Sequence, residues 1–409
     1  MNMIDYDVVI VGAGPAGSTA AKILSEKGIN SLLIDKEKFP REKPCGGGLP
    51  LWVLKRFPHL FNSNYIESYS YGGIIYSNTS KYKVEVHKNY PSIAMVLRKK
   101  FDNELVNTAI KNGVKFLDGV KVIDIKFENN YTILILSDNT SIKTSIVIGA
   151  DGFNSIIARK TGLFTKRRFT GVSVVEEFQL SEKILDKFYT KNRFCHIHLK
   201  IFGITGYGWV FPKKNHLNIG LGDCRLKSNR NQQNLKMIFN KYLEILKKQE
   251  IIPKNIKSIK LRGGSLPVWP HEKTYMNNVL LCGDAAGFIN PVTGEGIYYA
   301  LKSAEIAANI TIKALKAENT SERFLSQYEK EWKKDFGKDI KYMLNSTKKI
   351  RKENGKFIQT MSKDKKLAEM LFDIMTGQQS IYKLRWKLIR RYVYSSSKIS
   401  LCNLIKFKK

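Results

Sequence analysis

A glycine-rich turn near the N-terminus has the residue types and the spacing needed to bind a dinucleotide. Gly12-Ala13-Gly14-Pro15-Ala16-Gly17 follows the apolar run Tyr6–Val11 and opens a segment with helical spacing. In such a turn the first glycine permits the tight bend, the second lets backbone N–H groups approach a pyrophosphate, and the third allows strand and helix to pack closely. Asp35 ends the next apolar run, where a carboxylate would hydrogen-bond ribose hydroxyls. The spacing therefore predicts a βαβ unit that binds a dinucleotide.

Later segments favour FAD over NAD as the dinucleotide. Gly149-Ala150-Asp151-Gly152 ends one strand-like run, and Gly283-Asp284 ends another. Asn290–Ile297 then forms a glycine turn that opens a helix, and the N-terminus of that helix would stabilise negative charge on a reduced flavin. The order of these segments resembles that of the hydroxylase-like FAD enzymes. This resemblance implies that Asp284 contacts the ribityl–phosphate region of FAD.

Two further motifs narrow the family. The first is Lys43-Pro44-Cys45-Gly46-Gly47-Gly48, and the second is Tyr207-Gly208-Trp209-Val210-Phe211-Pro212. The second motif continues through a seven-residue gap to Gly220-Leu221-Gly222, which completes a Y-x-W-x-F-P, gap, G-x-G pattern. Together these motifs resemble the signatures of the geranylgeranyl reductases, and the resemblance runs from residue 6 to about residue 315.

The resemblance implies an FAD-dependent oxidoreductase that saturates double bonds of geranylgeranyl chains. Archaeal-type glycerophospholipid precursors, such as digeranylgeranylglyceryl phosphate, are the first expected substrates, and geranylgeranyl diphosphate is the second. The positions matching the family's FAD contacts are Ala16, Asp35, Cys45, Gly46, Gly48, Arg98, Val122, Asp284, Gly296 and Ile297. The positions matching its substrate motif are Tyr207, Trp209, Phe211, Pro212, Gly220 and Gly222. Asp35 departs from the glutamate that is commoner in flavin enzymes, but the shorter acid still reaches a ribose.

The roles of several candidate residues stay open at this level. The alternating aromatic residues of the second motif either line a tunnel for an apolar chain or form one face of an ordinary buried strand. Cys45 could act in catalysis, by orienting the flavin, donating a proton or guarding against oxygen, or it could be a small packing residue. No residue stands out as the general acid. His196 and His198 alternate on a strand-like run without a third ligand, so we expect no metal site and a structural or surface role for both.

The elements that position these residues indicate an α/β (α+β) fold. We expect a Rossmann-like FAD-binding domain of the hydroxylase-like type, an antiparallel-sheet substrate lobe and a basic, helical C-terminal region. The expected bounds are 1–165 with 271–320 for the discontinuous FAD-binding domain, 166–270 for the lobe and 321–409 for the C-terminal region. Helices are predicted at 18–27, 99–111, near 231–248 and after Gly296. Buried strands are predicted at 6–11, 31–34 and 278–282, short alternating strands from 114 to 150, and strand-like runs between about 170 and 270.

Composition indicates the cellular compartment of the protein. Five cysteines in 409 residues are widely separated and form no C-x-x-C pair, which argues against a disulfide framework, a zinc site or an iron–sulfur cluster and fits a reducing cytosol. Neither a signal peptide nor an apolar stretch long enough to span a membrane is evident in the sequence. We therefore expect a cytoplasmic protein, either free or peripheral on the cytoplasmic face of the membrane.

The net charge of +33 favours anionic partners, although a general lysine bias would explain it equally well. Residues 381–409 contain no acidic side chain and interleave basic and apolar residues around Trp386. This segment could lie on an anionic membrane or pack on the protein as a basic helix. Because no second dinucleotide-binding turn occurs, the electron donor is expected to be a ferredoxin or a reduced nicotinamide without a domain of its own.

Other functions remain as rivals. An FAD-dependent aromatic hydroxylase would keep the cofactor, but the Cys45 loop and the Tyr207 motif count against it. An electron-transfer flavoprotein–quinone oxidoreductase would need a clustered cysteine set that the sequence lacks. Outside the enzymes, a basic membrane- or nucleic-acid-binding protein that retains the fold would account for the charge. No specific nucleic-acid partner is expected.

Overall fold

The computed structural model describes residues 4–61, 64–128, 131–166, 169–226, 234–352 and 356–406. The chain divides into two compact units, each assembled from three separate stretches. Unit 1 comprises Met1–Lys43, Arg98–Thr170 and Ser265–Lys341. Unit 2 comprises Pro44–Leu97, Gly171–Gly264 and Tyr342–Lys409.

The described residues of unit 1 form an eight-stranded sheet whose main path runs β17-β18-β11-β1-β2-β8. The central strands are parallel, and β1 lies between β11 and β2. Val8, Val9 and Ile10 of β1 are fully buried, as expected for a parallel strand covered on both faces. The strands are β1 (Tyr6–Val11), β2 (Ser31–Asp35), β8 (Lys115–Asp118), β9 (Val122–Phe127), β10 (Thr132–Leu136), β11 (Ser141–Gly149), β17 (Tyr275–Met276) and β18 (Val279–Leu281).

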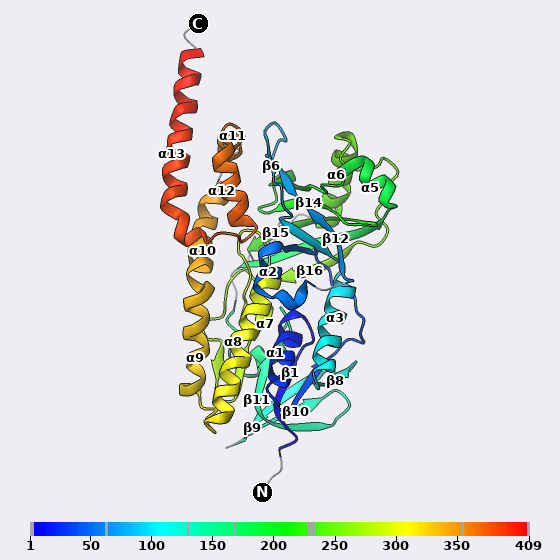
Figure 1. Cartoon of the computed structure of the whole chain (residues 1–409), viewed down its shortest axis with the longest axis vertical. Coiled ribbons are helices and arrows are strands. Elements are labelled where there is room, and N and C mark those ends of the chain that lie inside the picture. Colours follow the sequence, from blue (N-terminus) through cyan, green and yellow to red (C-terminus); the bar gives the residue numbers. More distant parts are fainter. Residues whose placement is uncertain are drawn as a thin grey trace. The chain divides into compact units, whose positions relative to one another are not determined.

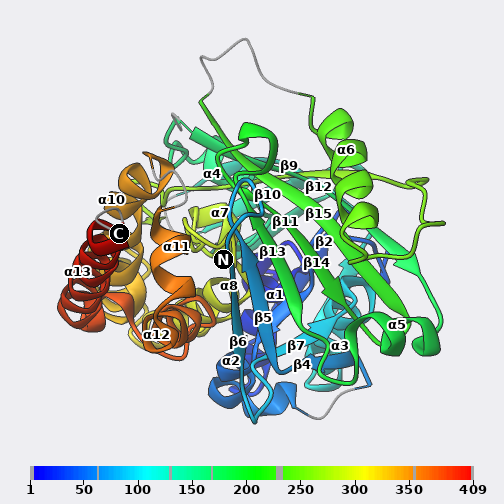
Figure 2. The same cartoon turned by 90° about the horizontal axis from the view of Figure 1, so that it is seen from above.

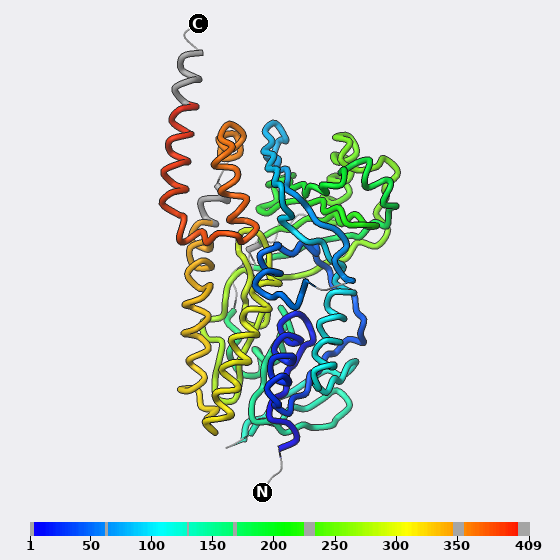
Figure 3. Tube along the Cα trace, in the orientation of Figure 1, coloured from blue at the N-terminus to red at the C-terminus, as the bar shows by residue number. Residues whose placement is uncertain are grey.

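The helices of unit 1 follow from local sequence signals. α1 (Pro15–Ser25) starts with proline, whose fixed φ and missing N–H suit the first turn of a helix. It lies between α8 (Ile297–Lys316) and α3 (Arg98–Lys111), and its alanine-rich faces permit close packing (Figure 1). A short connection after α8 returns the chain, so that α9 (Glu322–Trp332) lies beside it (Figure 3). The short helices are α4 (Ile156–Lys160) and α7 (Gly283–Ala286). A π-helical turn (Lys333–Gly337) leads into α10 (Lys338–Lys352), which belongs to unit 2 from Tyr342 onward.

The described part of unit 2 contains a seven-stranded sheet in the order β16-β12-β15-β14-β13-β5-β6. In it β13 pairs with β14 in antiparallel fashion and with β5 in parallel fashion. The strands are β5 (Gly72–Tyr76), β6 (Lys83–His87), β12 (Phe169–Gln179), β13 (Cys195–Leu199), β14 (Tyr207–Pro212), β15 (His216–Leu226) and β16 (Arg262–Leu266). A smaller sheet joins β3 (Gly48–Pro50), β7 (Ile93–Val96) and β4 (Ile66–Ser70).

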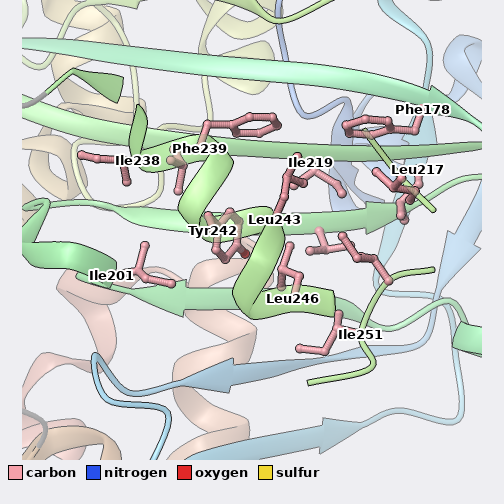
Figure 4. Close-up of a cluster of buried hydrophobic side chains, with 14 of the residues drawn as sticks. Phe178, Ile201, Leu217, Ile219, Ile238, Phe239, Tyr242, Leu243, Leu246 and Ile251 are labelled. Atoms are coloured by element: carbon pink, nitrogen blue, oxygen red, sulfur yellow. The ribbon is translucent and has the colours of Figure 1, made fainter. Parts of the chain in front are cut away.

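The larger core of unit 2 lies between the seven-stranded sheet and α6 (Leu235–Lys248), as Figures 2 and 4 show. Phe239, Tyr242 and Leu246 of α6 are fully buried against side chains from β14 and β15. Each fully buried side chain of this size stabilises the fold by roughly 1.5–3 kcal/mol relative to its exposed state. The remaining helices are α2 (Leu51–Arg56), α5 (Glu182–Tyr189), α11 (Lys356–Ser362), α12 (Lys365–Met375) and α13 (Ile381–Lys406), with 3-10 turns at Pro58–Leu60 and Ile201–Gly203.

The mixed α/β fold class is confirmed, but the division of the chain differs from the expected one. Residues 44–97 belong to unit 2, because β5 pairs with β13 in its sheet. Residues 342–409 also belong to unit 2, since Phe372 of α12 packs with Val84 and Val86 of β6. α5 was not expected from the sequence. In the described part of the chain, no helix is both long and apolar enough to cross a membrane.

Candidate functional site

The glycine turn of unit 1 contains two glycines that the protein's own packing requires. Gly12 has a φ of +102°, and a Cβ there would lie 2.4 Å from the carbonyl oxygen of Ala150. A Cβ on Gly17 would lie 1.8 Å from the carbonyl oxygen of Gly12. Gly14 differs, because the one described atom within 4 Å of its Cβ position is Nη2 of Arg41, at 3.6 Å. The space beside Gly14 is therefore left free by the fold, which fits the close approach of a bound pyrophosphate.

The first turn of α1 adds hydrogen-bond donors to this space. Gly14 is the N-cap of α1, and no described side chain caps the helix there. The first N–H groups of a helix have no partner within the helix and carry partial positive charge. The start of α1 therefore suits a phosphate group.

Asp35 fixes the glycine turn against the end of β2. Its carboxylate accepts hydrogen bonds from the N–H of Ala13 at 2.7 Å and from the N–H of Glu37 at 2.9 Å. Asp35 is buried, with 8% of its surface exposed. Because a carboxylate has about four acceptor sites, further bonds to a ribose remain feasible, and that predicted role stays a prediction.

A buried charge cluster lies next to the same turn. Arg98 donates to both oxygens of Asp102 at 2.7 Å, and Nη2 of Arg41 lies 3.0 Å from the same carboxylate. Asp102 is fully buried, and the guanidinium groups of Arg98 and Arg41 share its carboxylate. Nη1 of Arg41 is buried and has no hydrogen-bond partner among the described residues. Because Arg41 faces Gly14, this donor suits a pyrophosphate oxygen.

Arg41 was missed from the sequence, where it follows Pro40 in a loop without motif spacing. Arg98, which was expected to contact FAD, pairs with Asp102 in the structure, and its expected contact stays a prediction. Val122 is buried at the start of β9, opposite Leu136, and its cofactor contact likewise stays a prediction.

The remaining predicted residues of unit 1 gather near the start of α1. A Cβ on Gly283 would lie 3.3 Å from the Cβ of Ala16. Oδ1 of Asp284 lies 3.5 Å from the Cβ position of Gly296, and Ile297 begins α8 directly afterwards. The structure thus brings Ala16, Asp284 and Gly296 together, and their contact with FAD stays a prediction.

Glu295, which was not predicted, lies next to these residues. Its Oε1 accepts a hydrogen bond from the N–H of Tyr298 at 2.7 Å. Burial raises the pKa of the Glu295 carboxyl to about 7, the N–H groups of Tyr298 and Ile297 oppose that shift, and the charge of Asp284 adds to it. Near neutral pH this carboxyl is therefore poised between its two protonation states.

A Glu295→Gln variant is expected to change how stability depends on pH. The folded-state pKa of about 7 exceeds the ordinary 4.5, so the native protein holds a proton that the unfolded chain releases between these values. Wild-type stability therefore falls as the pH rises through this window, whereas glutamine does not titrate. From pH 5 to pH 8 we expect the variant to gain about 2–3 kcal/mol in free energy of unfolding relative to wild type. Denaturant unfolding at both pH values measures this, with exposed Glu331→Gln as the control; equal pH profiles for Glu295→Gln and wild type would contradict it.

In unit 2 the structure brings together the two motifs that lie far apart in the sequence. A Cβ on Gly46 would lie 2.9 Å from the ring of Phe211 and 3.3 Å from Nε1 of Trp209. A Cβ on Gly48 would lie 3.4 Å from the ring of Phe211. Glycine at both positions thus lets the Cys45 loop lie directly on the aromatic side chains of β14.

The aromatic residues of β14 do not belong to the core beneath α6. The rings of Tyr207 and Trp209 lie 5.9 Å apart and those of Trp209 and Phe211 6.3 Å apart, on one face of the strand. Val210, on the other face, belongs to the α6 core, and the ring of Tyr242 lies against Gly208. The aromatic face is therefore distinct from that core.

Two glycines of β15 and one proline complete the Tyr207 motif. Gly220 lies opposite Trp209 in the strand register, and a Cβ there would lie 2.1 Å from the indole. Gly222 faces the same ring at 3.7 Å, and Pro212 ends β14 in a buried position. These residues leave room for the indole to lie flat on β15. The substrate-lining role of these residues stays a prediction.

A polar network that sequence reasoning missed supports this arrangement. Asn218 is fully buried and donates to the carbonyl oxygen of Cys45 at 3.0 Å and to Glu177 at 2.7 Å. It accepts a hydrogen bond from Nε1 of Trp209 at 2.7 Å. Lys213, also fully buried, forms an ion pair with Glu177. The network therefore ties the Cys45 loop and the indole to one another, and its lysine and asparagine lie in the seven-residue gap of the Tyr207 motif.

The thiol of Cys45 is partly exposed and accepts a weak hydrogen bond from the N–H of Gly47 at 3.4 Å. Its catalytic role stays a prediction. His196 and His198 are held by Tyr76 and Tyr242, at 3.0 Å and 2.9 Å. Burial lowers the pKa of His196 to about 3 and that of His198 to about 4, so both rings are neutral at physiological pH. Among the described residues, no group of His, Cys, Asp or Glu side chains could hold a metal ion.

Comparison with known proteins identifies the family. Residues 5–339 match the FAD binding domain family. The chain is 33% identical over 384 residues to the digeranylgeranylglycerophospholipid reductase of Methanocaldococcus jannaschii, covering 91% of this chain and 92% of the relative. It is 32% identical over 374 residues to the enzyme of the same name from Methanococcus aeolicus, with coverages of 90% and 92%.

A solved structure has the same fold. The geranylgeranyl bacteriochlorophyll reductase-like protein of Thermoplasma acidophilum superimposes with a TM-score of 0.78 at 24% identity, covering 95% of each chain. The open space at Gly14, the uncapped start of α1 and the unpaired donor of Arg41 fit the FAD that the family match implies. The chain therefore belongs to the geranylgeranyl reductase family of FAD-dependent oxidoreductases.

Proposed function

We propose that this protein saturates the carbon–carbon double bonds of geranylgeranyl chains in an archaeal-type glycerophospholipid precursor, with digeranylgeranylglyceryl phosphate as the first substrate. The observation that carries the proposal is the row of aromatic rings of Tyr207, Trp209 and Phe211 on the face of β14 that does not belong to the α6 core. A polyisoprenoid chain offers no polar group along its length, so flat aromatic and glycine surfaces must orient it by shape. The names of the relatives support the same substrate class.

In this proposal unit 1 holds the cofactor. Arg41 and the start of α1 bind the diphosphate of FAD, and Asp35 keeps the glycine turn in place. When bound and reduced, FAD supplies the hydride that an unactivated alkene requires. Each saturated bond consumes two electrons and two protons, and an external reductant supplies the electrons.

Unit 2 orients the substrate in this proposal. The aromatic face of β14 contacts the apolar chain, and Asn218 with Lys213 and Glu177 holds the Cys45 loop in one position. Such fixed positioning lowers the barrier by holding the reactants in a reactive arrangement. The Cys45 thiol is the proton donor that we propose to test first, because it is partly exposed on this loop.

Two electron donors are proposed for this enzyme. A reduced ferredoxin is usually acidic, and the net charge of +33 would attract it over long distances. A reduced nicotinamide is the other donor. Stopped-flow bleaching of the flavin absorbance with each donor, at low and high salt, distinguishes them, because only the ferredoxin rate should fall steeply with salt.

The expected reaction is tested with the lipid itself. Dithionite-reduced protein with bound FAD is incubated with digeranylgeranylglyceryl phosphate, and the lipid is analysed by mass spectrometry. We expect mass gains in steps of one H2 per double bond, and none when dithionite is omitted. Gains with geranylgeranyl diphosphate alone would make the free diphosphate the substrate. No gain with either, together with oxygen-dependent hydroxylation of an aromatic compound, would overturn the proposal in favour of the hydroxylase.

A further inference from the structure

The C-terminal helix α13 (Ile381–Lys406) is attached to unit 2 by one face. Arg391 forms two hydrogen bonds to Asp364, at 2.7 Å and 2.9 Å, and Ser395 donates to the same carboxylate. Leu388 and Tyr392 pack against the apolar cluster of α11, α12 and β6. Figure 2 shows α11, α12 and α13 side by side. The attachment uses the side chains of one helical stripe, so the opposite side of α13 remains exposed.

The exposed side of α13 carries an apolar stripe. Trp386 is 65% exposed, Ile389 43% and Val393 55%, and their spacing of three and four residues places them in one row. Single exposed apolar side chains are common on soluble proteins. A tryptophan and two branched residues in one row on one helix instead form a continuous patch, which marks an interaction surface.

A basic stripe runs beside the apolar one. Lys383, Lys387 and Arg390 are exposed, and their spacing of four and three residues places them in a second row. None of the three forms a salt bridge with a described residue. No aspartate or glutamate occurs between residues 381 and 409. Between residues 383 and 393 the exposed side of the helix therefore combines an apolar row with an uncompensated positive row.

We propose that this side of α13, the stripes Trp386–Ile389–Val393 and Lys383–Lys387–Arg390, docks on an anionic lipid surface. At such a surface the apolar row enters the acyl boundary while the cations meet the phosphate groups. Tryptophan favours this boundary over both water and hydrocarbon. A second copy of the chain would place like charges opposite one another, which opposes association. An acidic protein would match the basic row but would also need an apolar row in register beside its acidic groups.

The inference rests on the proposed function in one respect: docking would give the protein access to a lipid substrate in the membrane. Docking is measured as binding, and the proposed reaction as a change in lipid mass. Each can therefore fail without the other.

The test is flotation of the full-length, FAD-loaded protein with vesicles of phosphatidylcholine, alone or mixed with an equal part of phosphatidylglycerol. We expect binding to the mixed vesicles only, and weaker binding as salt increases. Replacing the three basic residues (Lys383→Gln, Lys387→Gln, Arg390→Gln) should lower the partition coefficient on the order of 100-fold, because each charge near the surface contributes about fivefold. Replacing the apolar row (Trp386→Ser, Ile389→Ser, Val393→Ser) should lower it by at least about 10-fold. All six side chains are exposed, so the unfolding temperature should not change.

Matched controls separate a local surface from overall charge and hydrophobicity. Lys236→Gln, Lys241→Gln and Lys248→Gln remove the same charge from exposed positions of α6, and Trp269→Ser removes another exposed tryptophan. Both controls should bind nearly as wild type does.

Four outcomes would overturn the inference. One is that the wild-type protein does not bind anionic vesicles. Another is that both α13 variants bind these vesicles as strongly as the wild type does. The third is that the α13 variants lose binding to a reduced acidic ferredoxin but keep binding to vesicles, which would make α13 a protein-docking surface. The fourth is a dimer in light scattering that only these variants dissociate, which would make the partner a second copy.

Discussion

A Gly14→Ala variant is expected to fold with the stability of the wild type and to bind FAD about 10- to 100-fold more weakly. Gly14 has an extended backbone conformation (φ −73°, ψ −174°) that any residue adopts, and its Cβ position touches only the flexible end of Arg41 among the described residues. The added methyl group would therefore occupy the space of the pyrophosphate. Overpacking of this kind costs about 1–3 kcal/mol, and the stated change in Kd corresponds to about 1.4–2.8 kcal/mol within that range.

Gly17→Ala is the matched control within the same turn. Its Cβ would lie 1.8 Å from the carbonyl oxygen of Gly12, so the backbone of the turn must move and unit 1 should lose stability. Titration of the flavin-free protein with FAD, followed by flavin fluorescence, measures affinity, and denaturant unfolding measures stability. Unchanged FAD affinity in Gly14→Ala would remove the glycine turn from the cofactor site.

A Lys213→Met variant is expected to lose about 3 kcal/mol of stability. Lys213 is fully buried and its ammonium group pairs with Glu177, whose side chain is 32% exposed. Removing one partner of a buried ion pair costs about 3–5 kcal/mol, because the other charge is left without compensation. Partial exposure of Glu177 lets water reach that charge, which places the expected value at the low end of the range.

A double-mutant cycle tests the physical cause of this loss. In the Lys213→Met, Glu177→Gln double variant no unpaired charge remains, so most of the lost stability should return. The exposed neighbour Lys214→Met is the control and should change stability by less than about 0.5 kcal/mol. Additive effects of the two substitutions at positions 213 and 177 would show that the ion pair does not determine the stability of this network.

The network also holds the Cys45 loop and the Trp209 indole in fixed positions. Asn218 joins the Cys45 carbonyl, the Trp209 indole and Glu177, so a shift of any of them moves the others. Among the described residues, the thiol of Cys45 has one weak hydrogen bond, from the N–H of Gly47. The position of this loop is therefore set through its backbone, by the hydrogen bond from Asn218 to the Cys45 carbonyl.

The sequence by itself determined the features that depend on neighbouring residues. The strand, glycine turn and helix at residues 6–25 follow from an apolar run, a G-x-G-x-x-G spacing and a proline at the start of the helix. The long helix after Gly296 follows from its own periodicity and its glycine entry. FAD and the geranylgeranyl reductase family were also predicted, because their motifs are short and contiguous. Turn chemistry and periodicity are local, so the sequence contains them directly.

Only the tertiary structure decided which distant residues meet. The pairing of β5 with β13 placed residues 44–97 in unit 2, and the docking of α12 on β6 added the C-terminal helices. The contact of Gly46 with Trp209, the partnership of Lys213 with Glu177 and the unpaired donor of Arg41 have no local signal. A buried charge takes as partner whichever opposite charge the packed sheets and helices bring within reach. The pairing of distant charges therefore depends on which sheet edges and helix faces pack together on folding. Residue spacing along the chain does not encode that packing.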